Sequence, residues 1–154
     1  EPTVIEDRDT SEGKYKIVRY NYANANLASA RSRLLILEFK DGLLNAYVYI
    51  SSFGSDQTKF AWENIDQIEE GRSSQSAVLE ALGKPQGKAR CPSLLEDYKE
   101  RCQGGTEIWS YMTAERVSTL GAAYRGRRPE MKTVFVTFDQ DGTVVEVSRS
   151  KVGG

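Results

Sequence analysis

The side chains that could carry acid–base chemistry are two pairs of neighbouring carboxylates. Glu69 and Glu70 are adjacent, and Asp139 and Asp141 flank an expected hairpin turn. A carboxylate pair catalyses proton transfer only when its surroundings separate the two pKa values, and acids beside a turn are expected to be solvated. Histidine is absent, which excludes a histidine general base, a Ser-His-Asp triad and histidine-ligated metal sites. We predict no catalytic residue, no metal site and no cofactor; the alternative is a small hydrolase with an unrecognised site.

The two cysteines, Cys91 and Cys102, bound the segment CPSLLEDYKERC. Two thiolates without histidine make a poor zinc site, because structural zinc takes a full set of nitrogen or sulfur ligands. The spacing also differs from the C-x-x-C of redox enzymes. A local disulfide fits better and predicts an oxidising compartment, and the alternative is two reduced thiols that never meet.

Length and charge narrow the class of protein. A chain of 154 residues can bury a hydrophobic core as one domain or two small joined halves. The net charge of −1 gives no overall field toward nucleic acid or membrane. Residues 1–12 are acidic and polar, which predicts a disordered lead-in. No apolar run is long enough to span a bilayer, and the start at Glu1 without a signal peptide predicts a trimmed product.

The elements that must position these residues are mostly strands. Alternation of apolar and polar residues predicts single strands and hairpins at 14–22, 33–51, 107–113 and 132–150. The hairpins turn at Asp41-Gly42 and Asp141-Gly142, because this dipeptide accepts the positive φ angles of a tight turn. Loops are predicted at 24–32, 52–58 and 114–131.

Two short helices are predicted between the hairpins. Apolar residues at helical spacing from Phe60 predict a first helix that ends at Gly71. The second helix covers 73–82, with a serine cap at its start and Gly83 as its stop. Both are too short to be stable alone, so they are expected to pack on the sheet.

The two hairpins also indicate an internal repeat. Residues 13–59 are predicted to form a first β-rich repeat that lacks helices of its own, and residues 60–154 a second repeat of two helices and three strands. The expected fold class is α+β: a curved antiparallel sheet of about six strands with the two helices packed on one face.

The order of motifs in the second repeat resembles the SmpA/OmlA family of small bacterial outer-membrane lipoproteins. The residues that carry the resemblance are Ile68, Gly71, Ser73, Val78, Leu82, Gly83, Pro85, Trp109, Tyr111, Phe138 and Gly142. A tandem of such units resembles the fold of the β-lactamase inhibitor protein, whose repeats carry a disulfide loop after the second helix. Cys91 and Cys102 lie where that bridge would fall.

The resemblance implies residence in the periplasm and work by protein–protein contact without catalysis. The expected partner is a protein, with components of outer-membrane protein assembly as one candidate. Any membrane attachment would come through a lipid anchor encoded before Glu1. The alternative function is a secreted or periplasmic inhibitor that plugs an enzyme cleft.

Strand alternation separates the aromatic side chains from the aliphatic ones. If the aliphatic face lies under the helices, the opposite face presents Tyr20, Tyr22, Tyr47, Tyr49, Trp109, Tyr111 and Phe135. Aromatic residues of this kind are enriched at protein interfaces, and arginine from Arg125, Arg127 and Arg128 could frame the site. The alternative is that some rings, Trp109 above all, belong to the core.

The Tyr-Arg-Gly-Arg-Arg segment at 124–128 could also suit nucleic acid, but the overall charge favours a protein partner and no nucleic acid.

Overall fold

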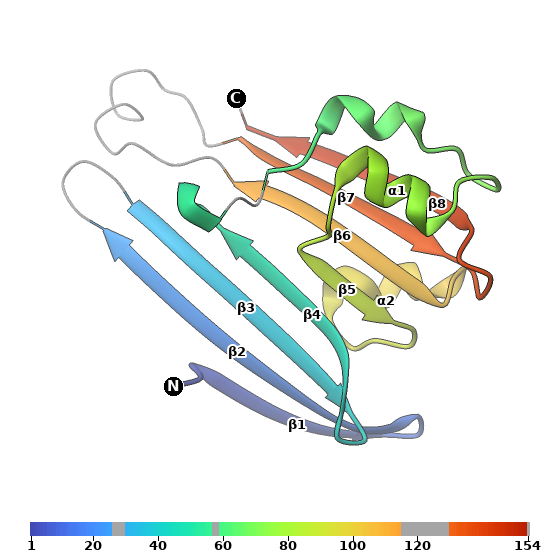
Figure 1. Ribbon diagram of the computed structural model, residues 1–154. Coiled ribbons are helices and arrows are strands. Elements are labelled where there is room, and N and C mark those ends of the chain that lie inside the picture. Colours follow the sequence, from blue (N-terminus) through green and yellow to red (C-terminus); the bar gives the residue numbers. More distant parts are fainter. Residues whose placement is uncertain (26–29, 57–58, 115–129, 154) are drawn as a thin grey trace.

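The computed structural model describes residues 1–25, 30–56, 59–114 and 130–153 (Figure 1). These residues form one eight-stranded antiparallel sheet in which each strand lies beside the next strand along the chain. The strands are β1 (Val4–Thr10), β2 (Gly13–Ala25), β3 (Ala30–Lys40), β4 (Leu43–Ser51), β5 (Gly87–Arg90), β6 (Glu107–Ala114), β7 (Met131–Phe138) and β8 (Val144–Val152). β1 and β8 are the two edges of this open sheet.

The antiparallel sheet with few short helices is confirmed, and the expected count of six strands is wrong. β1 adds one strand from the segment predicted to be a disordered lead-in, and it pairs with β2 from Val4 to Thr10. An edge strand is held by backbone hydrogen bonds while its side chains stay in water, so a polar composition does not prevent it. β5 adds the other strand, within a segment that has no clear alternation.

The turns at Asp41-Gly42 and Asp141-Gly142 and the cap signals of the second helix are confirmed, although in the second turn only Gly142 has a positive φ angle, of 78°. Asp41 and Gly42 have φ angles of 50° and 83°, the pattern of a tight primed turn between β3 and β4. Helix α1 (Gln75–Leu82) begins at Ser74, whose hydroxyl accepts from the backbone N–H of Ala77, and ends at Gly83 with φ of 81°. The loop predicted at 24–32 is shorter than expected, since β2 extends to Ala25 and β3 starts at residue 30.

The first predicted helix is instead a short 3-10 helix, η2 (Trp62–Gln67). The helix ends there because the following backbone forms hydrogen bonds with the edge strand β8 instead. The N–H of Gly71 donates to the carbonyl of Val144, and the N–H of Val144 donates to the carbonyl of Ser73. These two bonds hold the start of α1 against β8. A further 3-10 turn, η1 (Gly54–Asp56), follows β4.

Helices cover both faces of the sheet, which corrects the expectation of helices on one face. α1 lies in front of β6 to β8, and α2 (Glu96–Lys99) lies behind the centre of the sheet, followed by the 3-10 turn η3 (Glu100–Gln103) (Figure 1). We call the two sides the α1 face and the α2 face. The α1-face core comprises Ile65, Val78, Ala81, Leu82, Trp109, Tyr111, Val134, Val136, Phe138 and Val144. The α2-face core comprises Ile17, Ala46, Val48, Ala89, Leu95, Tyr98, Ile108, Met112 and Phe135.

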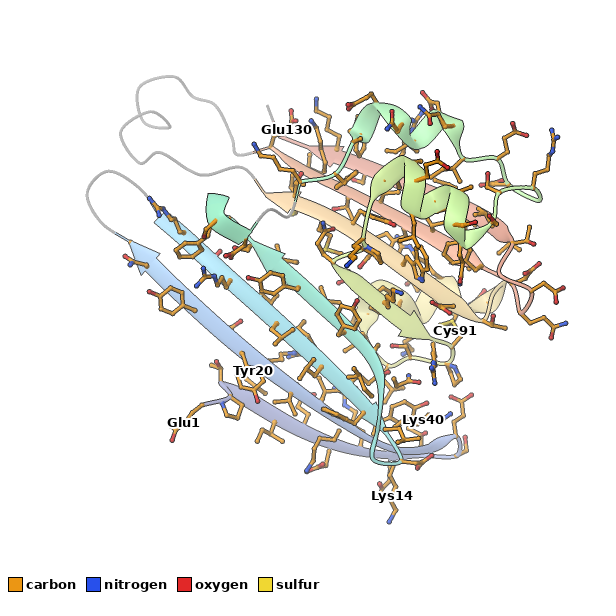
Figure 2. The ribbon with its side chains drawn as sticks, in the orientation of Figure 1. Glu1, Lys14, Tyr20, Lys40, Cys91 and Glu130 are labelled. Atoms are coloured by element: carbon orange, nitrogen blue, oxygen red, sulfur yellow. A yellow bond between two sulfur atoms is a disulfide. The ribbon has the colours of Figure 1, made fainter. Side chains whose placement is uncertain are left out.

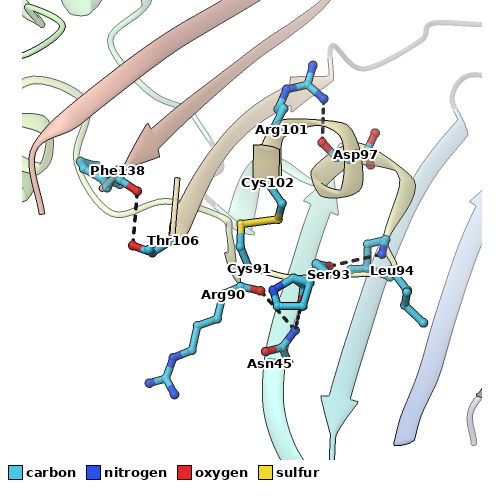
Figure 3. Close-up of a disulfide and its surroundings, with 12 residues drawn as sticks. Asn45, Arg90, Cys91, Ser93, Leu94, Asp97, Arg101, Cys102, Thr106 and Phe138 are labelled. Carbon is cyan, nitrogen blue, oxygen red and sulfur yellow. Dashed lines mark hydrogen bonds between the residues drawn. A yellow bond between two sulfur atoms is a disulfide. The ribbon is translucent and has the colours of Figure 1, made fainter. Parts of the chain in front are cut away.

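The predicted disulfide between Cys91 and Cys102 is present, with Cα atoms 5.3 Å apart (Figure 3). It closes the loop that carries α2 and η3. Asn45 on β4 donates to the carbonyls of Arg90 and Pro92 at the start of this loop. The loop is therefore fixed to β4 as well as to β5, and its Leu95 and Tyr98 pack into the α2-face core.

The junction between the two ends of the sheet is narrow, because β5 pairs with only three residues of β4. The Tyr98 hydroxyl reinforces it, since it lies 3.1 Å from the carbonyl of Tyr47 and 2.7 Å from the hydroxyl of Ser110. The buried Glu38 carboxylate accepts from the N–H of Leu94, 2.8 Å away. A continuous sheet thus joins the two predicted repeats, and the division at residue 60 stays a prediction.

Candidate functional site

Strand register brings six of the seven predicted aromatic residues to the α1 face. Tyr20 pairs with Leu35, which pairs with Tyr49. Lys88 on β5 pairs with Tyr47 on one side and with Trp109 on the other. Opposite residues of an antiparallel pair point to the same side, so these rings form rows across β2 to β6. Tyr22 and Tyr111 share the parity of their neighbours on the same strands.

Three of the seven rings lie in the core, so their predicted exposure is wrong. Trp109 and Tyr111 are 2% and 0% exposed and pack beneath α1 and η2. Phe135 lies on the α2 face, with its ring 6.0 Å from that of Tyr98. Alternation correctly predicts which side chains of one strand point to the same side. It does not predict how the sides of β6 and β7 match: Tyr111 pairs with Val134 and Trp109 with Val136, so the rings of β6 share a face with the aliphatic residues of β7.

The four tyrosines of β2 and β4 form what we call the open tyrosine surface: Tyr20, Tyr22, Tyr47 and Tyr49. Tyr20 and Tyr22 are 38% and 50% exposed, whereas Tyr47 and Tyr49 are half-buried. Leu35 and Leu37 on β3 lie between them and are also half-buried. Within the described part of the chain, no α-helix packs on the α1 face of β2 to β4, and Tyr20 lies on the part of the sheet away from α1 (Figure 2). Arg125, Arg127 and Arg128 fall outside the described residues.

A polar cluster that sequence reasoning missed closes one end of the open tyrosine surface. The Asp56 carboxylate on η1 accepts two hydrogen bonds from Arg33, at 2.7 and 2.9 Å. It also accepts from the Tyr49 hydroxyl, 2.8 Å away, and from the hydroxyl of Ser51. The Arg33 guanidinium in turn lies 4.2 Å from the centroid of the Phe53 ring. Sequence signals for this cluster are weak, because it joins residues of β3, β4 and a turn.

The cluster fixes the protonation and the position of its members. Hydrogen bonds from Arg33 and Ser51 hold the pKa of the Asp56 carboxyl well below its usual range. Burial raises the pKa of the Tyr49 phenol, and the hydrogen bond to Asp56 adds to this shift. Tyr49 therefore stays a protonated donor with its hydroxyl already engaged. A binding partner would therefore contact the ring of Tyr49 rather than its hydroxyl.

Acid is expected to weaken the attachment of η1 to the sheet. Because the folded pKa of Asp56 is depressed, its stabilising effect is present above the unfolded pKa and is lost as pH falls through the folded pKa. The difference in unfolding free energy between wild type and Asp56→Asn should be largest above about pH 5 and shrink below about pH 4. Urea unfolding at a series of pH values measures it. A difference that does not change with pH would refute this account.

Two further features of the described residues concern catalysis: metal-ligating side chains and a surface hollow. No group of three or more metal-ligating side chains occurs within residues 1–25, 30–56, 59–114 and 130–153. A shallow hollow of about 530 Å³ at the turn end of β1 to β3 is lined by Asp7, Asp9, Lys14, Tyr15, Lys16, Phe39 and Gly42. Lys16 and Asp7 form an exposed ion pair there, with nitrogen and oxygen 3.8 Å apart. Such a hollow can hold a small polar group.

Comparisons with known proteins give one structural likeness. No family model matches the sequence, and no curated protein matches it. A Streptococcus mutans protein described as a "putative beta-lactamase inhibitor protein" has a similar fold, with a TM-score of 0.48 and 15% sequence identity. The match covers 97% of this chain and 75% of that protein. Membership of the SmpA/OmlA family stays a prediction.

The helices of the described residues are all too short or too polar to cross a membrane. The disulfide is of the kind that persists in oxidising compartments such as the periplasm or the cell exterior.

Proposed function

We propose that this chain is a non-catalytic domain that binds another protein through the open tyrosine surface. The observation that supports the proposal most is a row of partly exposed tyrosines on neighbouring strands, outside both hydrophobic cores. Tyrosine offers a large rigid ring and a polar tip, which is why it is enriched at the centres of protein interfaces. β2 and β4 are each hydrogen-bonded to a strand on both sides, so their backbone is already ordered. Binding through the rings on these strands therefore costs little conformational entropy.

Two features favour binding over catalysis. Hydrogen bonds from Arg33 to Asp56, and from Lys151 and Lys132 to Glu130, hold the pKa values of both carboxyl groups below their usual range. A general acid at neutral pH needs the opposite shift. The Tyr49 hydroxyl already donates to Asp56, so it acts in the fold rather than on a substrate.

We further propose that the domain works in the periplasm, since the disulfide needs an oxidising environment. Components of outer-membrane protein assembly are the partner suggested by the SmpA/OmlA resemblance. An enzyme cleft is the partner suggested by the resemblance to the β-lactamase inhibitor protein. Both proposals use the open tyrosine surface as the binding site and differ only in the partner protein.

The test removes the rings without touching the core. In the variant Tyr20→Ala, Tyr22→Ala, Tyr47→Ala, we expect partner affinity to fall at least about 30-fold, the effect of losing an interface hot spot. The measurement is quantitative capture from bacterial envelope extract on the immobilised chain, followed by titration of the captured protein. A parallel assay measures inhibition of purified β-lactamases.

The matched control replaces three exposed apolar residues elsewhere: Leu79→Ala, Met131→Ala and Val152→Ala. This variant should keep full affinity. Circular dichroism and thermal unfolding check that both variants are folded. If the folded tyrosine variant keeps every partner, or if the control loses them equally, the proposed surface is wrong.

A further inference from the structure

Strand β5 places two basic residues on the α1 face beside the open tyrosine surface. Lys88 lies between Tyr47 and Trp109 in the strand register, and Arg90 is two residues further along the same face. The Arg90 side chain extends away from the disulfide loop that packs on the opposite face (Figure 3). β5 therefore forms the boundary between the open tyrosine surface and the part of the sheet covered by α1.

The Lys88 ammonium is positioned by a ring instead of an acid. Its Nζ lies 4.5 Å from the centroid of Trp109, within the range of a cation–π contact. Among the described ion pairs, none includes Lys88 or Arg90. The neighbouring Tyr47 hydroxyl likewise has no hydrogen-bond partner within the described residues, and burial raises the pKa of this phenol, which keeps it a donor.

The acids nearest to this strip are already engaged. Glu107 lies opposite Arg90 in the register and keeps its negative charge, but its carboxylate accepts from the Trp109 indole N–H at 2.6 Å and forms no ion pair among the described residues. Asp56 is neutralised by Arg33, 2.7 Å away. The two cations Lys88 and Arg90 outnumber the one carboxylate of Glu107, so this strip, with the Tyr47 phenol as a donor, is complementary to negative charge at hydrogen-bonding distance.

We propose that the open tyrosine surface recognises a protein segment with an acidic side chain, whose carboxylate docks between Tyr47 and Lys88. This inference rests on the proposed function and adds the chemistry of the partner. Flanking apolar or aromatic residues of the segment pack on Tyr20, Leu35 and Tyr49, and Arg90 attracts the segment from a more exposed position. A nucleic acid fits less well, because the chain has a net charge of −1.

The test uses defined probes and the whole chain. The probes are an array of short synthetic peptides with a central Glu between apolar and aromatic residues, each made also with Gln or Lys in that position. We expect the wild type to bind a subset of Glu peptides about tenfold more tightly than their Gln forms. This preference should fall as salt rises from about 50 mM to about 500 mM, a test that needs no variant.

Variants locate the effect. Lys88→Gln should bind the Glu and Gln peptides equally, and Tyr47→Phe should lose part of the preference. The matched control is Lys99→Gln, an exposed lysine on α2 behind the sheet, which should keep the full preference. The Tyr20→Ala, Tyr22→Ala, Tyr47→Ala variant should lose both forms of the peptide.

The outcomes separate this inference from the proposed function. Equal binding of Glu and Gln peptides by wild type, lost in the tyrosine variant, overturns the acidic segment and leaves the tyrosine surface as the binding site. Binding of no peptide at all also overturns it, while the capture experiment still decides the proposed function. Tighter Lys88-dependent binding to oligothymidylate than to any Glu peptide overturns the choice of a protein occupant.

Discussion

Replacing Gly87 with alanine is expected to lower the free energy of unfolding by about 3 kcal/mol, the sum of overpacking and a disturbed buried hydrogen bond. Gly87 is the first residue of β5, where β4, β6 and the disulfide loop meet. A Cβ atom there would overlap the hydroxyls of Ser110 and Tyr98 and lie 2.9 Å from the Tyr47 carbonyl oxygen. The Tyr47 carbonyl cannot move without disturbing the pairing of β4 with β5. The structure therefore cannot accommodate the added Cβ atom by a small shift.

Chemical denaturation measures this effect, and Gly104→Ala is the matched control. Gly104 has a negative φ angle of −122°, and no atom lies within 4 Å of the position of an added Cβ. Its replacement should change stability by less than about 0.5 kcal/mol or raise it slightly, because alanine has fewer unfolded conformations. A Gly87→Ala variant as stable as Gly104→Ala would mean that the junction at β5 is looser than described.

The second large effect is expected from Trp109→Ala, at about 3–5 kcal/mol of lost stability. Trp109 is 2% exposed, and its ring centroid lies 4.7 Å from that of Phe138. Its indole N–H donates to Glu107, so truncation also leaves this carboxylate without its partner. Lys88 loses its cation–π contact in the same variant.

Tyr22→Ala is the comparison for the same measurement. Tyr22 is 50% exposed on the open tyrosine surface, and its replacement should cost less than about 1 kcal/mol. The two aromatic residues, which sequence alone groups together, are thus expected to separate into one that maintains the fold and one whose half-exposed ring contributes little to stability. Similar losses of stability in both variants would contradict this division.

Local signals made much of the fold predictable. The Asp41-Gly42 turn and the serine cap of α1 follow from backbone preferences of a few neighbouring residues, and both are confirmed. The strands around them follow from alternation over a similar range. The disulfide was also predictable, because chain spacing and the absence of other metal ligands left few alternatives.

The faces of the sheet could not be predicted in the same way. Which side of β6 meets which side of β7 depends on the pairing of Trp109 with Val136, and alternation within one strand does not fix this relation. The second covering layer, α2, lies inside the disulfide loop and is too short to show a period. The Asp56 cluster depends on contacts between β3, β4 and η1, so no single segment of the sequence predicts it.

The charged strand β1 has a consequence for how the molecule behaves at high concentration. An open sheet ends in a strand whose outward backbone groups can recruit another chain and start a filament. β1 carries Glu6, Asp7, Arg8 and Asp9 in succession, and a second β1 aligned in parallel and in register would set identical charges opposite each other. The acidity that suggests disorder in the sequence therefore disfavours in-register pairing of two β1 edges.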